Sequence, residues 1–499
     1  MLGAEKSGER SAPAQRVVIA FGGIAFRLVS FGQFGFWTDE AYVALTTRVT
    51  SPAEFWLATG PTPLAWAASL RLVAPWQPPE VGLRVVPLLF GVGTLALAWR
   101  FGVRAGASAT AGVVALAAIA FDPVSVAYAK EFKQYGAEAF FALLAFVCLA
   151  ETTRRPSAGA TARLALALAI GVLFSNSQLL VAPPVLLALL GAAFARRDGA
   201  GIRWALVAIA AVGTWMGAWY FLVMVPHLRP RLTEVFANAF VPRHSVADAA
   251  AFVWTVTTER LGITLGPVGW SVGFAALVVA AFAESSFRPV TAALVLLFAE
   301  TVGLSVAGRV PFSEPRAVLF LYTTMAAVLG AALGWTAAPA RRRLPRILAA
   351  VTLMGLAVDF AARTDWRALV VPQRVEDVGP LVRTVEAARG PEDVVLVYWR
   401  SRYVWAYYQR AQPRLVPVFA NAVGYVPAID DPRVRLVENA NAADVVGDAF
   451  ADAAVVWFVG SRLGFDAAVL QSVLVQHGNV TQRETRENAL LLRLERRSP

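Results

Sequence analysis

Lysine is rare in this sequence, and two lysines lie close together in a polar stretch between hydrophobic runs. Only Lys6, Lys130 and Lys133 are lysines among 45 basic residues, and the other 42 are arginine. Lys130 and Lys133 belong to "YAKEFKQYG", residues 128–136. An ammonium group is a compact charge that suits phosphate, and a helix would place both lysines on one face. We predict an anion site here. The alternative is that the lysines only solvate a loop or contact lipid headgroups.

Two adjacent acids, Asp39 and Glu40, follow the first hydrophobic run in "GFWTDEAYVALTTRV", residues 35–49. A carboxylate can act as a general base toward a hydroxyl. The same residues also fit a helix start with Thr38 or Asp39 as the N-cap, and both roles can hold at once. We predict a catalytic role for both acids. No metal ligand is predicted, and a divalent cation held by the two carboxylates stays an alternative.

Two further acids are associated with hydrophobic runs. Glu300 lies inside one, in "LLFAETVGL", and an acid within a membrane segment is a candidate site residue. We predict that it contributes to the site and pairs with an arginine such as Arg316. Asp122 ends another run and fits a second acid or a helix end equally well.

The composition indicates that a membrane protein positions these residues. The chain has 499 residues, of which 57% are hydrophobic and 16% are charged, whereas soluble proteins carry about 25% charged residues. Apolar runs long enough to cross a bilayer recur along the chain. The net charge of +11 comes from arginines between these runs, so we predict no nucleic-acid partner. A single cysteine, Cys148, excludes a disulfide framework.

Eleven segments are predicted to span the membrane, after a disordered cytoplasmic tail at residues 1–16. They are 17–34, 82–99, 106–121, 136–151, 162–174, 178–195, 204–225, 262–282, 289–307, 317–338 and 346–361. Arginines cluster before the first span and after every second span from there on, which the positive-inside rule assigns to the cytoplasm. The exterior loops are then 35–81, 122–135, 226–260 and 308–316.

The composition changes near residue 364. The residues from Asp365 onward hold 16 of the 34 acidic residues and no spanning run. Here "DVVLVYW", "AAVVWFVGS" and "NALLLRLER" are predicted to be strands, and "EDVGPLVRTVEAA" and "SRYVWAYYQ" helices. We predict a transmembrane domain at 17–363 and an α/β domain at 364–499, which the odd number of spans places outside the cytoplasm.

Four segments, in this order, resemble lipid-linked-sugar glycosyltransferases of the GT-C fold class. The resemblance is to the branch of the protein O-mannosyltransferases and the lipid A aminoarabinose transferase. The segments are "WTDEAYVAL", "LRVVPLLFGVGTLAL", "AYAKEFKQYGAEAFFALLAF" and "VPFSEPRAVLFLYTTMAAVLG". The likeness covers residues 17–365 as a pattern. It departs at "TGPTPLAW", residues 59–66, where the aminoarabinose-type enzymes have a lysine before the paired prolines.

The resemblance implies an inverting transfer of a sugar from a polyprenyl-phosphate donor to an acceptor hydroxyl. The reaction would take place at the outer face of a bacterial cytoplasmic membrane, with a lipid, glycan or protein as acceptor and membrane lipids as neighbours. A transporter or flippase of a lipid-linked sugar is the alternative, and a non-catalytic scaffold is a third possibility.

By position, the resemblance assigns the catalytic acid to Asp39, with Glu40 beside it. The matching positions near the donor phosphate are Lys130, Lys133, Arg84 and Arg316, with Gln134 and Tyr135 in the same segment as the lysines. Because the first-loop lysine is missing, Lys130 and Lys133 become the main phosphate candidates.

Overall fold

The computed structural model describes residues 2–60, 62–227, 236–260, 265–338, 343–370, 375–411, 413–418, 424–463 and 466–497. Its contacts divide the chain into two compact units. The helical unit comprises Met1–Ser30, Pro63–Trp66 and Val85–Pro372, and the sheet unit comprises Phe31–Thr62, Ala67–Arg84 and Gln373–Pro499. Most of the predicted first exterior loop therefore belongs to the same unit as the C-terminal residues.

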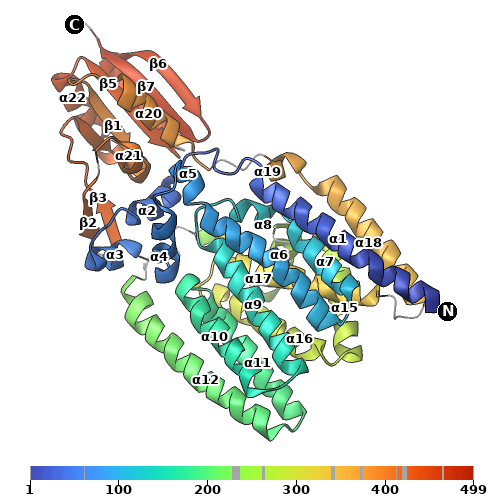
Figure 1. The fold of residues 1–499 in the computed structure, drawn as a ribbon. Helices are drawn as coiled ribbons and strands as arrows, with labels where there is room; N and C mark the ends of the chain where they lie inside the picture. The colour runs from blue at the N-terminus through green and yellow to red at the C-terminus, as the bar shows by residue number, and fades with distance from the viewer. Residues whose placement is uncertain are drawn as a thin grey trace. The chain divides into compact units, whose positions relative to one another are not determined.

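The helical unit consists of long apolar helices (Figure 1). They are α1 (Leu2–Leu28), α6 (Val85–Gly106), α7 (Ala109–Ala120), α9 (Tyr135–Arg154), α10 (Ala158–Phe174), α11 (Gln178–Ala195), α12 (Gly199–Trp219), α15 (Gly266–Ala283), α16 (Phe287–Val306), α17 (Pro315–Thr336) and α18 (Arg343–Arg363). The shorter elements are α8 (Pro123–Tyr128), α14 (Val246–Thr255), α19 (Trp366–Val370), η1 (Tyr220–Met224), η2 (Val225–His227), η3 (Ala237–Ala239) and η4 (Val256–Arg260).

Each predicted span coincides with one of the long helices. The first span differs at both ends: α1 begins at Leu2, so the predicted tail is helical, and it ends at Leu28 rather than at residue 34. Parts of the predicted loop 226–260 and of the predicted span 262–282 lie outside the described residues.

Seven helical segments among the described residues are long and apolar enough to cross a membrane. They are Pro79–Gly106, Tyr135–Arg154, Gln178–Ala195, Gly199–His227, Gly266–Ala283, Phe287–Val306 and Pro315–Thr336. The apolar helices α7 and α10 are shorter. The chain is thus a polytopic helical protein as predicted, whereas the number of eleven crossings stays a prediction.

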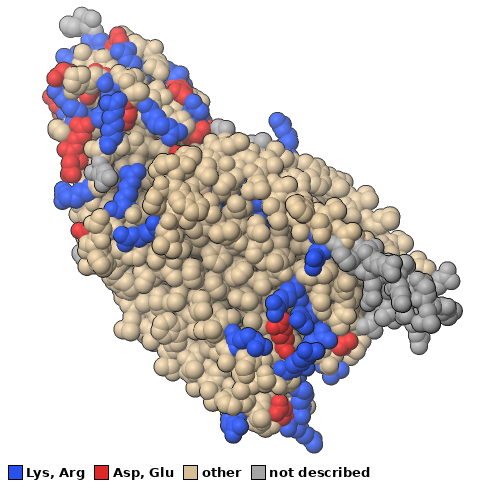
Figure 2. All heavy atoms as spheres, viewed as in Figure 1, with Lys and Arg blue, Asp and Glu red and all other residues tan. Residues whose placement is uncertain are grey.

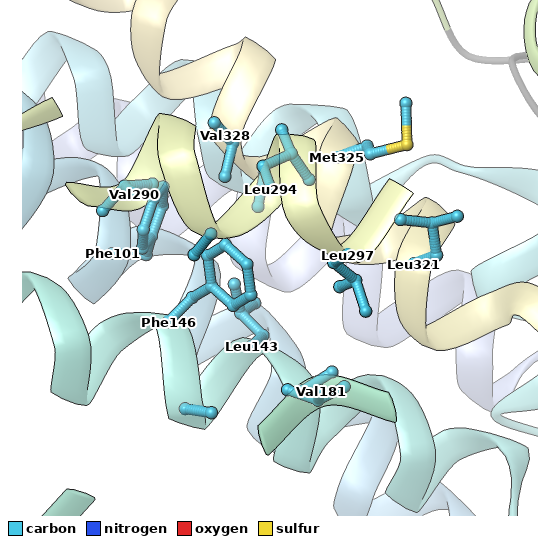
Figure 3. Close-up of a cluster of buried hydrophobic side chains, with 14 of the residues drawn as sticks. Phe101, Leu143, Phe146, Val181, Val290, Leu294, Leu297, Leu321, Met325 and Val328 are labelled. Carbon is cyan, nitrogen blue, oxygen red and sulfur yellow. The ribbon is translucent and has the colours of Figure 1, made fainter. Parts of the chain in front are cut away.

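Helix α17 lies inside the helical unit, and 94% of its most apolar 18-residue stretch is buried. Gly330 and Gly334 face α7: a Cβ on Gly334 would lie 2.6 Å from Cα of Ala111, and one on Gly330 3.0 Å from Cα of Ala115. Small residues four positions apart allow two apolar helices to approach this closely. Figure 3 shows another part of this core, where apolar side chains from α6, α9, α11, α16 and α17 gather, among them Phe101, Phe146 and Leu294.

Three of the helix ends that the arginine pattern assigns to the cytoplasm contact one another. Arg100 and Arg104 lie 2.7 and 3.3 Å from the carboxylate of Glu151, and Arg196 donates to the carbonyl of Thr153 at 2.7 Å. These contacts join the ends of α6, α9 and α11. On the face in Figure 2, most charged side chains of the helical unit gather at this end, and the middle is almost free of charge. Which side of the membrane this end faces stays a prediction.

The sheet unit contains a five-stranded mixed sheet in the order β4-β1-β5-β7-β6. Strand β1 runs parallel to β4 and β5, and β7 is antiparallel to β5 and β6. The bounds are β1 (Val394–Tyr398), β4 (Val434–Val437), β5 (Val455–Ser461), β6 (Gly478–Arg486) and β7 (Ala489–Arg496). A second, antiparallel sheet pairs β2 (Leu415–Val418) with β3 (Gly424–Pro427).

Helices from both parts of the chain complete the sheet unit. The C-terminal helices are α20 (Val378–Ala388), α21 (Arg402–Tyr408), α22 (Ala442–Asp452) and α23 (Asp466–His477), with the turns η5 (Trp399–Ser401) and η6 (Asn439–Asn441). The first-loop helices are α2 (Thr38–Thr46), α3 (Pro52–Thr59), α5 (Pro79–Gly82) and α4 (Leu64–Val73), of which α4 belongs to this unit only from Ala67 onward. The predicted α/β class is confirmed, and β1, β5, β7, α20 and α21 lie where the sequence predicts them.

Candidate functional site

The two predicted acids lie in the first turn of α2, in the sheet unit. The N-cap of this helix is Trp37, whose backbone is extended, and no side chain caps the helix. Neither Thr38 nor Asp39 is therefore the N-cap, as one of the two interpretations of the sequence had it. Asp39 is half-buried and Glu40 is fully buried. Negative charge in the first turn is favoured by the helix dipole.

Glu40 is held by Arg84, which lies 44 residues further along the chain. Nη2 of Arg84 lies 2.5 Å from Oε2 of Glu40, and Nε lies 3.2 Å from Oε1, so the guanidinium binds both carboxylate oxygens. Arg84 also donates to the carbonyls of Phe34 and Gly35, at 2.6 and 3.3 Å. The structure thus brings together two of the predicted site residues. A bidentate buried ion pair fixes the chain before α2, and Asp39 is the less buried of the two acids.

The two predicted phosphate lysines lie in the helical unit, in the turn between α8 and α9. This turn is not helical, so the lysines do not share a helix face as the spacing suggested. Lys130 is buried, and its Nζ donates to the carbonyl of Leu369 at 3.0 Å. Lys133 is half-buried.

Arg27, at the end of α1, is a buried cation beside Lys130. Burial, and then the positive charge of Arg27, lower the pKa of Lys130 to about 8. Arg27 donates to the carbonyls of Gly23, Ile119 and Ala120 at 2.9–3.2 Å, but its Nε is buried and has no hydrogen-bond partner. Within the described ranges, no carboxylate lies within ion-pair distance of either cation. Two buried cations this close, one with an unused donor, form a group suited to an anion.

Asp122 and Tyr322 belong to the same end of the helical unit. Asp122 caps α8 by accepting from the backbone N–H of Ser125 at 2.6 Å, and Tyr322 donates to its other oxygen at 3.0 Å. Its charge attracts the Arg27 guanidinium without a direct ion pair. Asp122 therefore has the helix-end role, and it keeps the α8–α9 turn close to α17.

The remaining predicted residues are more dispersed within the helical unit. Gln134 precedes α9, and its Oε1 is buried without a partner, while the ring of Tyr135 packs edge-on against Tyr128 at 5.1 Å. Nε of Arg316 lies 3.0 Å from Oε1 of Glu314. The predicted pair with Glu300 is not formed, because Glu300 makes no ion pair with any residue that the structure describes.

Arg27 is a further candidate site residue, which the sequence prediction did not include. It stands inside the apolar run 17–34, and a charge within such a run is itself a signal for a site. Among the described residues, no group of three or more His, Cys, Asp or Glu side chains could hold a metal ion.

No family model and no curated protein matches the sequence, but the fold matches solved structures. One is the crystal structure of ArnT from Cupriavidus metallidurans bound to undecaprenyl phosphate, with 13% identity and a TM-score of 0.55. Another is ArnT from the same organism in the apo state, with 13% identity and a TM-score of 0.52. Both alignments cover 98% of this chain and 98% of the other.

The chain has an ArnT-like fold. The fold class predicted from four short segments is thereby confirmed. The likeness also extends through the C-terminal residues, which the sequence resemblance did not cover. At this identity it concerns the fold alone, and the roles of individual residues rest on their own geometry.

Proposed function

We propose that this protein transfers a sugar from a polyprenyl-phosphate-linked donor to an acceptor hydroxyl at the outer face of a bacterial cytoplasmic membrane. The observation that carries the proposal is the ArnT-like fold, which extends over 98% of the chain and is shared with a structure of ArnT bound to undecaprenyl phosphate. The apolar helices fit a multi-pass protein that meets an apolar donor within the bilayer. The acceptor is a lipid, a glycan or a protein.

Lys130 and Arg27 are the groups that we assign to the donor phosphate. As the sugar leaves, negative charge develops on the lipid phosphate, and cations held in place before the reaction stabilise that charge. Nζ of Lys130 uses one donor on Leu369, so an ammonium group still has two N–H bonds to offer. Nε of Arg27 adds a further donor that no protein group uses.

Asp39 is the group that we assign to the acceptor. Its carboxylate takes the proton from the acceptor hydroxyl while that oxygen attacks the anomeric carbon. The bond between this carbon and the phosphate oxygen breaks, and its electron pair goes to the phosphate. A single displacement of this kind inverts the anomeric centre. Glu40 and Arg84 are already engaged with each other, so we assign them to holding the loop rather than to proton transfer or phosphate binding.

The test is a transfer assay with purified full-length protein and a radiolabelled polyprenyl-phosphate sugar in liposomes. The expected result is consumption of the donor, release of polyprenyl phosphate and transfer of label to an acceptor or to water. Lys130→Met should reduce consumption, whereas Lys6→Met, which changes the lysine near the N-terminus, should not. Movement of intact donor between leaflets without consumption would identify a flippase and overturn the proposal.

A further inference from the structure

The first turn of α2 is bonded to a buried carboxylate from the C-terminal part of the sheet unit. The hydroxyl of Thr38 lies 2.7 Å from Oε2 of Glu376 and 3.0 Å from the carbonyl of Arg400. Glu376 is only 4% exposed. Ser461 donates to the same Oε2 at 3.1 Å, and Nε of Arg462 lies 2.5 Å from Oε1. One carboxylate thus connects the start of α2 with the end of strand β5.

Other C-terminal residues hold the chain on both sides of this turn. The backbone N–H of Phe36 donates to the Tyr408 hydroxyl at 2.9 Å, and Arg48 donates to the carbonyl of Tyr407 at 3.0 Å. The Tyr425 hydroxyl donates to the carbonyl of Tyr42, and the two rings stack at 4.7 Å. The whole segment from Phe36 to Arg48 is therefore attached to residues of the C-terminal sequence.

This attachment matters because α2 has little stability of its own. It has nine residues and no side-chain cap, and isolated helices shorter than about 12 residues are marginal in water. Its orientation must come from tertiary contacts. In the N-terminal turn, Arg84 holds the side chain of Glu40, and Glu376 holds the side chain of Thr38, the residue directly before Asp39.

We propose that Glu376 is a positioning residue, which fixes the direction of Asp39 by holding Thr38. The C-terminal sheet is then part of the catalytic apparatus and not an independent appendage. The inference rests on the proposed role of Asp39 as general base. It assigns no contact with substrate to Glu376.

The test is a double-mutant cycle in the full-length protein with Glu376→Gln and Thr38→Val. Glutamine cannot accept hydrogen bonds on both atoms, and valine removes the hydroxyl at nearly constant shape. Because a misplacement of about 1 Å can cost about 100-fold in rate, each single change should lower kcat by about 10- to 100-fold, with the donor KM nearly unchanged. The double variant should be no slower than the slower single variant, because each single change already removes the Thr38–Glu376 contact, although Glu376→Gln also alters the contacts with Ser461 and Arg462. Thr38→Ser keeps the hydroxyl, so its turnover should be close to that of the wild-type protein.

Glu386→Gln is the matched control. Glu386 is a buried acid of the same unit, 6% exposed, and it bonds to Arg389 and to the backbone of Arg410 rather than to α2. It should keep the wild-type kcat. Hydrogen exchange supplies a readout that does not depend on turnover: the amides of residues 38–46 should exchange faster in Glu376→Gln than in Glu386→Gln.

The outcomes separate this inference from the proposed function. A wild-type protein that never consumes donor overturns the function and the positioning role together. A wild-type protein that turns over, with Thr38→Val equally active, overturns the positioning role alone. Equal losses in Glu376→Gln and Glu386→Gln, or additive losses in the double variant, would show a general effect on stability and also overturn it. If Glu376→Gln fails to fold, Thr38→Val and Thr38→Ser still decide.

Discussion

Adjacent residues of the same chemical type have different environments in this protein. Glu40 is 1% exposed and bound on both oxygens by Arg84, whereas Asp39 is only half-buried. Removing one partner of a buried ion pair leaves the other charge uncompensated, which costs about 3–5 kcal/mol. Changes at Glu40 should therefore act mainly on folding. The catalytic hypothesis is best tested at Asp39.

We predict that Asp39→Asn lowers kcat by about 10²–10⁴-fold, the usual effect of removing a general base, and leaves donor affinity nearly unchanged. Asparagine keeps the shape but cannot take the proton. Turnover and donor binding of the purified variant are the measurements. Glu54→Gln is the control, because Glu54 is an exposed acid in the first turn of the neighbouring helix α3. Ordinary turnover in Asp39→Asn would show that this acid is not the base.

The pKa of Lys130 predicts a pH dependence of donor binding. Burial and the charge of Arg27 disfavour the ammonium form and lower this pKa to about 8. The cation is therefore present below that pH and is lost as the pH rises through it, while a phosphodiester does not titrate in this range. Donor affinity should fall between about pH 7 and pH 9.

Lys130→Arg is the matched variant for this measurement. A guanidinium stays charged throughout that pH range, so the fall in affinity should be absent. Donor affinity is measured for both proteins at each pH. An identical pH profile in the two would show that another group is responsible.

Among the elements, the α8–α9 turn depends on close packing against α6. A Cβ on Gly91 of α6 would lie 2.5 Å from Cβ of Ala129, the residue before Lys130, and 3.5 Å from Nε of Arg27. Both proposed phosphate ligands are thus adjacent to one glycine. Its lack of a side chain allows the turn to approach the helix.

We predict that Gly91→Ala weakens donor binding and destabilises the fold by about 1–3 kcal/mol, as overpacking does. Gly191→Ala, in α11, is the control because its Cβ would meet no atom within 4 Å. It should be neutral or slightly stabilising, since alanine is the better helix former. Thermal unfolding and donor affinity are measured for both variants. Equal behaviour of the two would contradict the packing argument.

For the whole molecule, the polar residues of the helical unit form two groups at helix ends. The arginine-rich ends of α6, α9 and α11 contact one another. A second group of polar residues lies at the end of α1, before α8, before α9 and near the start of α17: Arg27, Asp122, Lys130 and Tyr322. If the chain makes the predicted eleven crossings with the arginine-rich end in the cytoplasm, we expect the C-terminal residues to lie outside the cytoplasm.

We predict that a reporter active only outside the cytoplasm is active when it is fused after Pro499. A fusion after Arg197, in the arginine-rich group, is the control and should be active only with a cytoplasmic reporter. Protease accessibility in spheroplasts provides a second measurement. A cytoplasmic C-terminus would contradict the topology and the proposed place of the reaction.

Local patterns in the amino-acid sequence were enough to predict the helical elements and part of the sheet. Long apolar runs form helices because each helix satisfies its own backbone hydrogen bonds, and buried strands such as β1 show a continuous run of apolar residues. The prediction did not include the four-residue strands β2, β3 and β4 or the polar strand β6, and it also missed helices α22 and α23. Strand β6, "GNVTQRETR", is almost wholly exposed, so no apolar pattern marks it, and its pairing with β7 defines it.

The partners of the chemical residues could not be predicted in this way. The sequence shows that Asp39 and Glu40 are adjacent. Only the tertiary structure shows that Arg84 forms an ion pair with Glu40, and that Glu376, 338 residues from Thr38, bonds to the first turn of α2. It likewise brings Arg27 close to Lys130. The physical reason is that hydrophobic periodicity reports which face of an element is buried, whereas a polar contact depends on which distant segment packs against that face.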